Sequence, residues 1–518
     1  MTTTYAAVNR EAVAELVDIC GTERVIVAPQ GRLVRAMVPA PFPFHRWADE
    51  APEIAVLPET TEEVVAIVKL ANRLRIPIVP RAGATGLNDG AKPNRGGIVV
   101  DTKRMNKVLE IDTTDWTVTI QPSINMLKLN EYLAPHGVWY PDDPASYPVS
   151  IVSGRIGTGG WSLLGSRYGH VRDNVISMEV VLPTGEVIEV GQGGGRKIRH
   201  SSTGFRLKDL FLGHQGTLGI ATQATLELYP RPEAEFPAFF GYESFEAGYR
   251  AMQPFCRSNL ATLAGVILFD ERKVQYLRRD DEAYIPEPES LQSIVAVAAY
   301  GSEGEVAAAR DRLMRIGADT GGRYLGEELS ELDWASRHDR YATPLHGRSR
   351  DRAVHMSWHC EDAAITYSQL PFVKRRWHEI ADRYIAEHEV FDNWGMFFYT
   401  NNAYKGWGDF LVEIDIGIWE QRLDEASWRA WTDLKREITQ VSLDAGGSIS
   451  ACHGATREGE VELVPAELGG QFDLMLKLKR MLDPNNIMNP GKYLLDQAYE
   501  DPEGSGEPRR GAPVDGEG

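Results

Sequence analysis

Three glycine-rich segments have the composition of loops that bind anions. In the first, PRAGATGLNDGA (80–91), Gly83 and Gly86 lack side chains that would keep backbone N–H groups away from a phosphate. Successive N–H groups in such a turn form a concave anion site. Neither GxGxxG nor GxxxxGKS/T occurs here, so the segment is neither a Rossmann loop nor a Walker A loop. Taken alone, it could equally be a plain turn.

A histidine near the C-terminus could transfer a proton. His453 lies in GGSISACHG (446–454), and an imidazole with its ordinary pKa of about 6.5 can accept a hydroxyl proton near neutral pH. The alternative is a histidine whose ring packs and hydrogen-bonds at a turn. The adjacent Cys452 is expected to be a small packed residue and not a nucleophile.

Two further segments could contact a substrate. Arg340 and Arg348 lie in HDRYATPLHGRSRDR (338–352), and a guanidinium can hold a carboxylate or phosphate through two parallel hydrogen bonds. A solvated basic loop is the alternative. Tyr399 lies in the aromatic-rich NWGMFFYTNN (393–402). These aromatic residues could enclose an aromatic substrate, and Tyr399 could hold a phenol oxygen, or they could belong to the core.

The elements that must position these residues form two α+β units. Thr60 and Glu63 make a plausible capping box for a helix through about Leu74, and IPIVP (76–80) predicts a strand leading into the first loop. In the second unit, apolar runs alternate with amphipathic segments, which predicts an antiparallel sheet backed by helices. The expected strands are 265–271, 293–301, 395–401 and 409–418, and the expected helices lie near 304–317, 370–388, 424–445 and 468–482. Residues 446–454 predict a strand and turn, and 150–169 predict little regular structure.

Composition excludes several classes of protein. The 518 residues carry a net charge of −19, which argues against a nucleic-acid-binding protein. No apolar run reaches the roughly 18 residues of a membrane span, and the first residues contain no secretory signal. The four cysteines form no CxxC pair, which favours reduced thiols and a cytoplasmic location.

The order and spacing of the motifs make them specific as a set. The second and third glycine-rich segments are PDDPASYPVSIVSGRIGTGGWSLLGSRYG (141–169) and SSTGFRLKDLFLGHQGTLGIATQATLELYP (201–230). With VPRAGATGLNDGA and LDPNNIMNPGKYL, they make the chain resemble the vanillyl-alcohol oxidase/p-cresol methylhydroxylase superfamily of FAD flavoproteins. The C-terminal SISACHG and LDPNNIMNPGK are similar to the branch of D-lactate, D-2-hydroxyglutarate and glycolate oxidoreductases, and to alkyl-dihydroxyacetone-phosphate synthase.

The resemblance implies a fold and a set of FAD-binding residues. It implies an α+β protein with a two-part FAD-binding domain of the p-cresol methylhydroxylase type (1–230 and 468–495) and an α+β cap domain with an antiparallel sheet (231–467). The composition of 496–518 predicts a disordered tail. His453 matches the branch's catalytic histidine. The residues matching FAD contacts are Arg81, Ala82, Gly83, Ala84, Thr85, Gly86, Leu87, Asn88, Pro141, Asp143, Ser146, Gly157, Gly159, Gly160, Tyr168, Gly169, Gly216, Thr217, Gly219, Ile220, Asn489 and Lys492.

The chain also departs from the family pattern. The usual glycine pair before the small-residue run is Ser153–Gly154, followed by the bulky Arg155. Some relatives attach FAD covalently through histidine or cysteine, but 80–97 contains no histidine and 140–169 no cysteine. Non-covalent FAD is therefore expected, and His170 or a histidine of the cap domain would be the exception. Relatives of the hydroxy-acid branch often hold a metal through a histidine pair, and 393–416 has no histidine, so no metal is expected.

The resulting functional prediction is an FAD-dependent oxidoreductase that oxidises a small hydroxyl-bearing substrate of the 2-hydroxy acid type. His453 would be the base and an arginine the anchor. Three alternatives stay open: an oxidase of para-substituted phenols or aromatic alcohols, an alkyl transferase of the ether-lipid type, and a flavin-binding subunit of a larger complex. The electron acceptor could be O2, a quinone or a cytochrome, and a homo-oligomer is possible.

Overall fold

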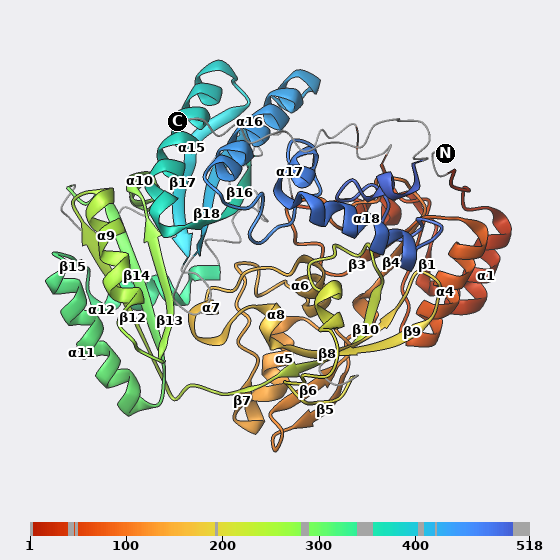
Figure 1. The fold of residues 1–518 in the computed structure, drawn as a ribbon, viewed down its shortest axis with the longest axis horizontal. Coiled ribbons are helices and arrows are strands. Elements are labelled where there is room, and N and C mark those ends of the chain that lie inside the picture. Colours follow the sequence, from red (N-terminus) through yellow and green to blue (C-terminus); the bar gives the residue numbers. More distant parts are fainter. Residues whose placement is uncertain are drawn as a thin grey trace.

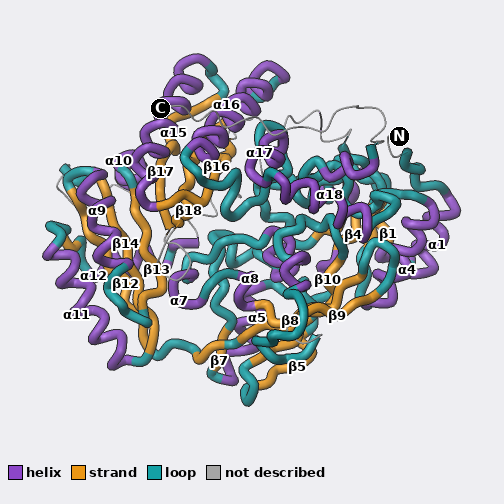
Figure 2. The backbone as a smooth tube through the Cα atoms, in the orientation of Figure 1, coloured by secondary structure: helices purple, strands orange, loops and turns teal. Residues whose placement is uncertain are grey.

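The computed structural model describes residues 4–39, 46, 50–191, 195–280, 290–338, 356–401, 409–419 and 422–500. Within these ranges it describes no side chains for 276–280, 356–359, 392–401 and 409. Arg340, Arg348 and the tail from 501 lie outside the described residues. Two sheet-containing parts lie side by side (Figure 1), and loops fill the middle of the molecule between them (Figure 2).

The first part contains two main sheets with helices packed against them. One has the strand order β1-β2-β4-β3 and the other the order β5-β6-β10-β8-β9. The strands of the first sheet are β1 (Val25–Ile26), β2 (Ile54–Val56), β3 (Ile78–Arg81) and β4 (Ile98–Asp101). Those of the second are β5 (Val108–Asp112), β6 (Thr117–Ile120), β8 (Val175–Val181), β9 (Val187–Gly191) and β10 (Ile220–Glu227). A small pair joins β7 (Val138–Trp139) to β11 (Tyr229–Pro230).

Local sequence explains how the first glycine-rich loop is reached. Thr60 caps α4 (Thr61–Leu74) by accepting a hydrogen bond from the backbone N–H of Glu63 at 3.2 Å. The apolar stripe of α4 is buried against the sheet. The chain then returns through β3, which pairs in parallel with β4, and the loop begins at the carboxyl end of β3. The predicted helix and strand are confirmed here.

The segment 150–169 is more regular than predicted. It forms α6 (Val152–Thr158) and α7 (Gly165–Tyr168). The helical turns of α6 end at Gly159, which adopts a left-handed φ of 64°. The prediction of little regular structure is wrong because Val152 and Ile156 bury a short apolar stripe that the glycines around them obscure in the sequence. The remaining helices of this part are α1 (Arg10–Cys20), α2 (Pro29–Val34), α5 (Met126–Leu133) and α8 (Val171–Asn174).

The second part is built on an antiparallel sheet with the order β15-β12-β14-β13-β17-β18-β16. Its strands are β12 (Ala234–Tyr242), β13 (Leu263–Phe269), β14 (Ser293–Gly301), β15 (Arg323–Tyr324), β16 (Met356–Thr366), β17 (Phe391–Asn401) and β18 (Asp409–Trp419). Its helices are α9 (Phe245–Cys256), α10 (Glu271–Asp280), α11 (Glu303–Asp319), α12 (Glu327–Ala335), α15 (Leu370–Glu387) and α16 (Glu425–Asp444). The predicted α+β fold with an antiparallel cap sheet is confirmed.

The two faces of this sheet have different partners. One face packs on α9, α11, α15 and α16 in the largest apolar cluster. On β18, Val412, Ile414 and Ile416 point into that cluster. Because side chains alternate along a strand, Leu411, Glu413 and Asp415 point to the opposite face. That face turns toward the first part of the molecule.

The C-terminal segment contacts both parts. It contains α17 (Val464–Leu468) and α18 (Gly470–Leu482), and Met488 then forms a parallel bridge with Ile78 of β3. Residues 446–454 form turns and bends and no strand, so the predicted strand is wrong there. Polar contacts to Asp362, described below, replace strand pairing in this segment. No helix in the described ranges is long and apolar enough to cross a membrane.

Candidate active site

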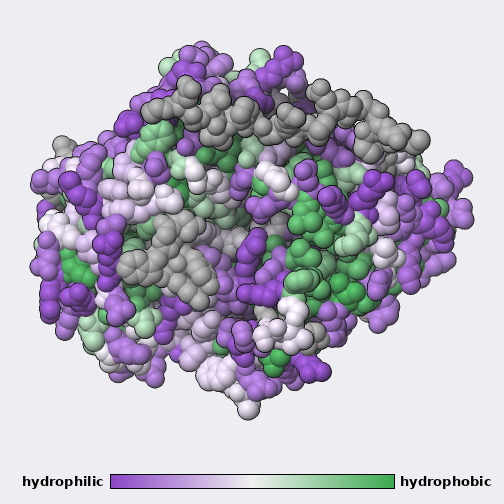
Figure 3. Space-filling model, viewed as in Figure 1, coloured by the Kyte–Doolittle hydropathy of each residue, from purple (hydrophilic) through white to green (hydrophobic). Residues whose placement is uncertain are grey.

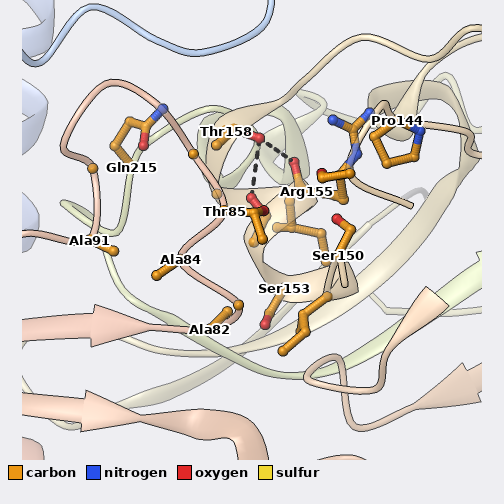
Figure 4. A pocket seen from close by; sticks show the side chains of 18 of the residues that line it. Ala82, Ala84, Thr85, Ala91, Pro144, Ser150, Ser153, Arg155, Thr158 and Gln215 are labelled. Atoms are coloured by element: carbon orange, nitrogen blue, oxygen red, sulfur yellow. Dashed lines mark hydrogen bonds between the residues drawn. The ribbon is translucent and has the colours of Figure 1, made fainter. Parts of the chain in front are cut away.

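A large cavity lies between the glycine-rich loops and the cap sheet. Figure 4 shows Ala82, Ala84 and Thr85 on one side of it, with Ser150 and Arg155 on the other. Of the residues predicted to contact FAD, those lining the cavity are Arg81, Ala82, Gly83, Ala84, Thr85, Gly86, Leu87, Asn88, Asp143, Ser146, Gly157, Gly216, Gly219 and Ile220. His453 lines it as well, together with Leu411, Glu413 and Cys452.

The backbone of this cavity fits a phosphate-bearing cofactor. A Cβ added at Gly86 would have Thr158 Cγ2 as its nearest neighbour, 4.0 Å away, and one added at Gly157 would meet no atom within 4 Å. Both glycines therefore leave open space for a ligand to approach the backbone. Ala84 adopts a left-handed φ of 51°, a conformation that bends the loop around the cavity. The cradle fits the pyrophosphate of FAD.

The C-terminal segment supports the loop without entering the cavity. Asn489 Nδ2 donates to the carbonyl oxygens of Gly90 at 2.8 Å and Gln215 at 2.6 Å. Lys492 Nζ donates to the carbonyl oxygen of Asp89 at 2.6 Å. Burial lowers the pKa of Lys492 to about 7, although Asp89 opposes the shift. The structure places these side chains on the backbone of the loop and outside the cavity lining, and their predicted contact with FAD stays a prediction.

Asp143 lines the cavity, but its carboxylate is already paired. Arg337 Nε lies 2.9 Å from one carboxylate oxygen, and His338 Nε2 lies 2.6 Å from the other. Burial alone would raise the pKa of Asp143, but these two partners lower it to about 2. Arg337 and His338 follow α12 in the cap, so this cluster connects the two parts of the molecule.

His453 is held beside a buried carboxylate. Asp362 Oδ1 lies 3.5 Å from His453 Nδ1. Asp362 also accepts hydrogen bonds from Ser450 Oγ at 2.7 Å and from the backbone N–H of Cys452 at 2.7 Å. Burial alone would lower the pKa of His453, but Asp362 and then Glu413 reverse this effect and raise it to about 9. Burial alone would raise the pKa of Asp362, but His453 and the hydrogen bonds from Ser450 and Cys452 lower it to about 2.

A second carboxyl group shares the cavity wall. Glu413 pairs with Asp362 in the β16–β18 register, and its Oε2 is buried with no hydrogen-bond partner among the described residues. Burial, joined by repulsion from Asp415 and Asp362, raises the pKa of Glu413 to about 8 against attraction by His453. The surroundings therefore favour the protonated forms of His453 and Glu413 and the ionised form of Asp362.

The same cluster has donor atoms close enough to hold a metal. Ligand atoms of Cys360, Glu413 and His453 lie within 4.8 Å of one another, as do those of Asp362, Cys452 and His453. The histidine pair whose absence led to the prediction of no metal is not part of either set. The prediction of no metal stays a prediction.

The remaining predicted residues lie elsewhere. Tyr399 is on β17, paired with Glu413 in the sheet register, and its side chain is not described. Tyr168 packs edge-on against Trp139 and Tyr229. Gly159 and Thr217 line a neighbouring cavity. Pro141, Gly160 and Gly169 do not line the main cavity.

Sequence reasoning missed several residues of the site. Arg155 appeared as a bulky departure from the family pattern, but it forms a buried ion pair with Asp142 at 2.9 Å and lines the cavity. Asp362 was not identified, because nothing in MSWHCEDAAIT (356–366) distinguishes it from the adjacent Glu361. Glu413 and Asp415 had a visible signal, since they are acidic residues at alternate positions of the otherwise apolar FLVEIDIGI (410–418).

Comparisons with known proteins agree with this geometry. Residues 52–191 match the FAD binding domain family, and residues 231–493 match the family of FAD linked oxidases, C-terminal domain. The glycolate oxidase subunit GlcD of Bacillus subtilis is 27% identical over 95% of this chain and 98% of its own length. A probable mitochondrial D-lactate dehydrogenase of Danio rerio is 28% identical over 94% of this chain and 92% of its own length.

Solved structures share the fold. p-Cresol methylhydroxylase with substrate bound has a TM-score of 0.74 at 19% identity, over 93% of this chain and 96% of its own. Alkyldihydroxyacetonephosphate synthase has a TM-score of 0.73 at 21% identity, over 93% of this chain and 84% of its own. Because both domain families match in the expected order and the fold is shared, the chain belongs to the vanillyl-alcohol oxidase/p-cresol methylhydroxylase family of FAD-linked oxidases.

Proposed function

We propose that this FAD-linked oxidase oxidises a 2-hydroxy acid, with His453 as the base that accepts the hydroxyl proton. The observation that carries the proposal is the His453–Asp362 pair in the wall of the cavity. The relatives named as glycolate oxidase and D-lactate dehydrogenase support the substrate class. Glycolate and D-lactate share a hydroxyl group on the carbon next to a carboxylate, so the site has to bind a carboxylate and remove the hydroxyl proton.

FAD would lie along the glycine-rich loops, with Gly86 and Gly157 allowing backbone contact, and would supply hydride acceptance. Asp362 lies beside Nδ1 of His453, so it favours a proton on that nitrogen and leaves Nε2 to take the substrate proton. Because the pKa of His453 is about 9, Nε2 becomes a free base as pH rises. The neutral form of Glu413 would not repel an anionic substrate.

We infer that FAD is held without a covalent bond. His170, one of the histidines that could contradict this, does not line the main cavity, and its Nδ1 accepts a hydrogen bond from Ser162 N–H at 3.0 Å. Burial lowers the pKa of His170 to about 4. Its ring packs at 4.3 Å from that of Trp161, which fixes it away from the glycine-rich loop.

Anaerobic flavin reduction tests the substrate class. The purified holoprotein is mixed with D- and L-2-hydroxy acids in one series, and with para-substituted phenols in another, and the flavin absorbance is followed. Bleaching by a 2-hydroxy acid supports the proposal. Bleaching by a phenol alone would overturn it in favour of the aromatic alternative. No described side chain favours that alternative, since those of 392–401 are not described.

A partner subunit is a further part of the proposal. The Bacillus subtilis relative is named as a subunit of glycolate oxidase, so this chain could assemble with other chains. Purification of the native protein at low salt, followed by analysis of the bands that accompany it, tests this. A single chain that turns over with a soluble dye but with no added protein would show that the flavin chemistry needs no partner.

A further inference from the structure

Three side chains that can ligate a metal meet in the cap, at a place that the proposed mechanism does not use. Asp270 directly follows β13, Glu271 begins α10, and His378 lies on α15. One ligand atom from each of them lies within 4.8 Å of those from the other two. None of the three lines the cofactor cavity. The cluster is therefore separate from the carboxyl groups around His453.

Two of these side chains are buried and carry a polar atom without a hydrogen bond. Asp270 has no exposed surface, and His378 is 8% exposed. Asp270 Oδ2 and His378 Nε2 lie 3.1 Å apart, but neither atom has a hydrogen-bond partner among the described residues. Their contact therefore does not have the geometry of a hydrogen bond. Because burying polar atoms without partners is costly, a ligand bound between them would stabilise the cap.

The distance between these two atoms is close to that of two ligands on one zinc ion. In a tetrahedral site with bonds of about 2.0–2.1 Å, two ligand atoms lie about 3.3 Å apart. The 3.1 Å between His378 Nε2 and Asp270 Oδ2 is near this value. Glu271 can supply a third ligand and water the fourth, as in zinc sites with three protein ligands. The imidazole argues against Mg²⁺ and Ca²⁺, which prefer oxygen ligands alone.

The contacts between α10 and α15 hold the ligands in place. On α15, Lys374, His378 and Asp382 are four residues apart, so they lie on one face of the helix. Lys374 Nζ lies 2.6 Å from Glu271 Oε1, and Asp382 Oδ2 lies 2.7 Å from Arg272 Nη2. Ion pairs on both sides of the histidine therefore fix the start of α10 against α15, and Figure 1 shows the two helices in the upper part of the cap.

Both carboxylates keep acceptor positions for an ion. Asp270 Oδ1 accepts a hydrogen bond from the backbone N–H of Lys273 at 2.9 Å, which orients the carboxylate that would bind the metal. Glu271 contacts Lys374, but a carboxylate has about four acceptor positions, so it can bind an ion as well. The Glu271 side chain is 29% exposed, and Figure 3 shows mostly hydrophilic side chains along the outer edge of the cap. An ion can therefore enter from solvent.

We propose that Asp270, Glu271 and His378 bind a divalent transition metal, with zinc as the best match, and that the ion fastens the start of α10 to α15. Its role would be structural, since the three residues lie outside the cofactor cavity. The prediction of no metal rests on the histidines missing from 393–416, and this site uses none of those positions. The inference does not depend on the substrate or on the proposed function.

The test measures zinc on the purified holoprotein. The protein is stripped with a chelator, titrated with zinc sulfate in competition with a zinc indicator, and then analysed for zinc per chain by mass spectrometry. Asp270→Asn and His378→Gln each remove one buried ligand. Glu271→Gln removes the partly exposed ligand, so it disturbs packing least. His136→Gln, which alters an exposed histidine outside the cluster, is the matched control, and flavin absorbance shows that each variant is folded.

We expect one zinc ion per chain in wild type and in His136→Gln. Each ligand substitution should weaken zinc binding about a hundredfold or more, since residues that only orient a ligand already contribute about tenfold to a hundredfold. Zinc should also raise the melting temperature of wild type more than that of Glu271→Gln. A wild-type protein that binds no zinc, or an affinity equal to wild type in all three variants, would overturn the proposal.

X-ray absorption of the zinc-loaded protein separates this cluster from the one beside His453. The proposed site predicts nitrogen and oxygen at about 2.0–2.1 Å from zinc and no sulfur at about 2.3 Å. Sulfur in the zinc coordination shell would place the ion at Cys360 or Cys452, which are the thiols close to His453, and would contradict the assignment. Because the measurement needs no turnover, it stands whether or not a 2-hydroxy acid reduces the flavin.

Discussion

Asp362 on the cap strand β16 lies 3.5 Å from His453 Nδ1, and the same carboxylate accepts the backbone N–H of Cys452 at 2.7 Å. One buried side chain therefore orients the imidazole and also fixes the turn that carries it. The opposite side of that turn is tied to the cofactor loop, since Asn88 Nδ2 donates to the carbonyl oxygen of Gly454 at 2.5 Å. The proposed base is thus positioned relative to both the cap and the FAD-binding loop.

His453→Ala should leave FAD bound and slow flavin reduction by a 2-hydroxy acid about 10²-fold or more, as expected for loss of a general base. Rapid anaerobic mixing measures the rate, and the absorbance of the protein as purified measures the flavin content. A variant that is reduced at the wild-type rate would exclude His453 from the mechanism.

Flavin reduction by wild-type protein should accelerate as pH rises toward about 9, because the base must first lose the proton that the Asp362 carboxylate stabilises. In Asp362→Asn the pKa of His453 should fall toward its usual value of about 6.5, so the midpoint of the profile moves to lower pH. The plateau rate should fall about tenfold to a hundredfold, since the ring loses its orientation. Asp444→Asn, which alters an exposed carboxylate at the end of α16, should change neither value.

Gly86→Val should yield a folded protein without FAD, because the added side chain would occupy the open space in front of the loop. Gly304→Val, at an exposed position of α11 where a Cβ meets nothing within 4 Å, is the control for the general effect of the substitution. Flavin absorbance relative to protein absorbance gives the answer. Normal flavin content in Gly86→Val would show that the phosphates lie elsewhere.

Acid precipitation should release all of the flavin into the supernatant, as expected for a non-covalent cofactor. A yellow pellet would show a covalent bond. In that case the residues to substitute first are His214, Cys452 and His453, because each of them lines the cofactor cavity.

The Asp143 cluster should make stability depend on acid. The pKa of the Asp143 carboxyl is lowered in the folded state from 3.8 to about 2. Its contribution to the free energy of unfolding is therefore fully present above about pH 4 and is lost as pH falls toward 2. By linkage this contribution is about 2 kcal/mol. Arg337→Ala would leave the carboxylate buried with His338 alone and should cost about 3 kcal/mol or more in the free energy of unfolding. Urea unfolding at about pH 2.5 and at pH 7 measures both effects, and an acid dependence equal to that of wild type in Arg337→Ala would contradict them.

Much of the fold could be predicted because its signals are local. The α4 cap at Thr60, the strand before the first loop and the amphipathic helices of the cap all follow from residues within a few positions of each other. The glycine-rich loops could be assigned to one cofactor only through their order, since each is an ordinary turn in isolation. Helix α6 was not predicted because its buried apolar side consists of only two residues, Val152 and Ile156, and glycines lie between and beside them.

The chemistry around His453 could not be predicted to the same extent. Asp362 is 91 residues away from it in the chain, and Glu413 is 40 residues away. Their approach depends on the β16–β18 register and on the turn at 450–454, and both are set by tertiary packing. Asn489 and Lys492 illustrate the limits of a motif without a structure. Their motif was specific, but the structure shows them supporting the cofactor loop from behind.

The most direct test of the account is the rate of anaerobic flavin reduction by D-2-hydroxy acids between pH 6 and pH 10, in wild type and in Asp362→Asn. We expect bleaching by a 2-hydroxy acid, a rate that rises with pH through a midpoint near pH 9 in wild type, and a midpoint at lower pH in the variant. A rate independent of pH in both proteins, or bleaching by phenols and by no hydroxy acid, would contradict it.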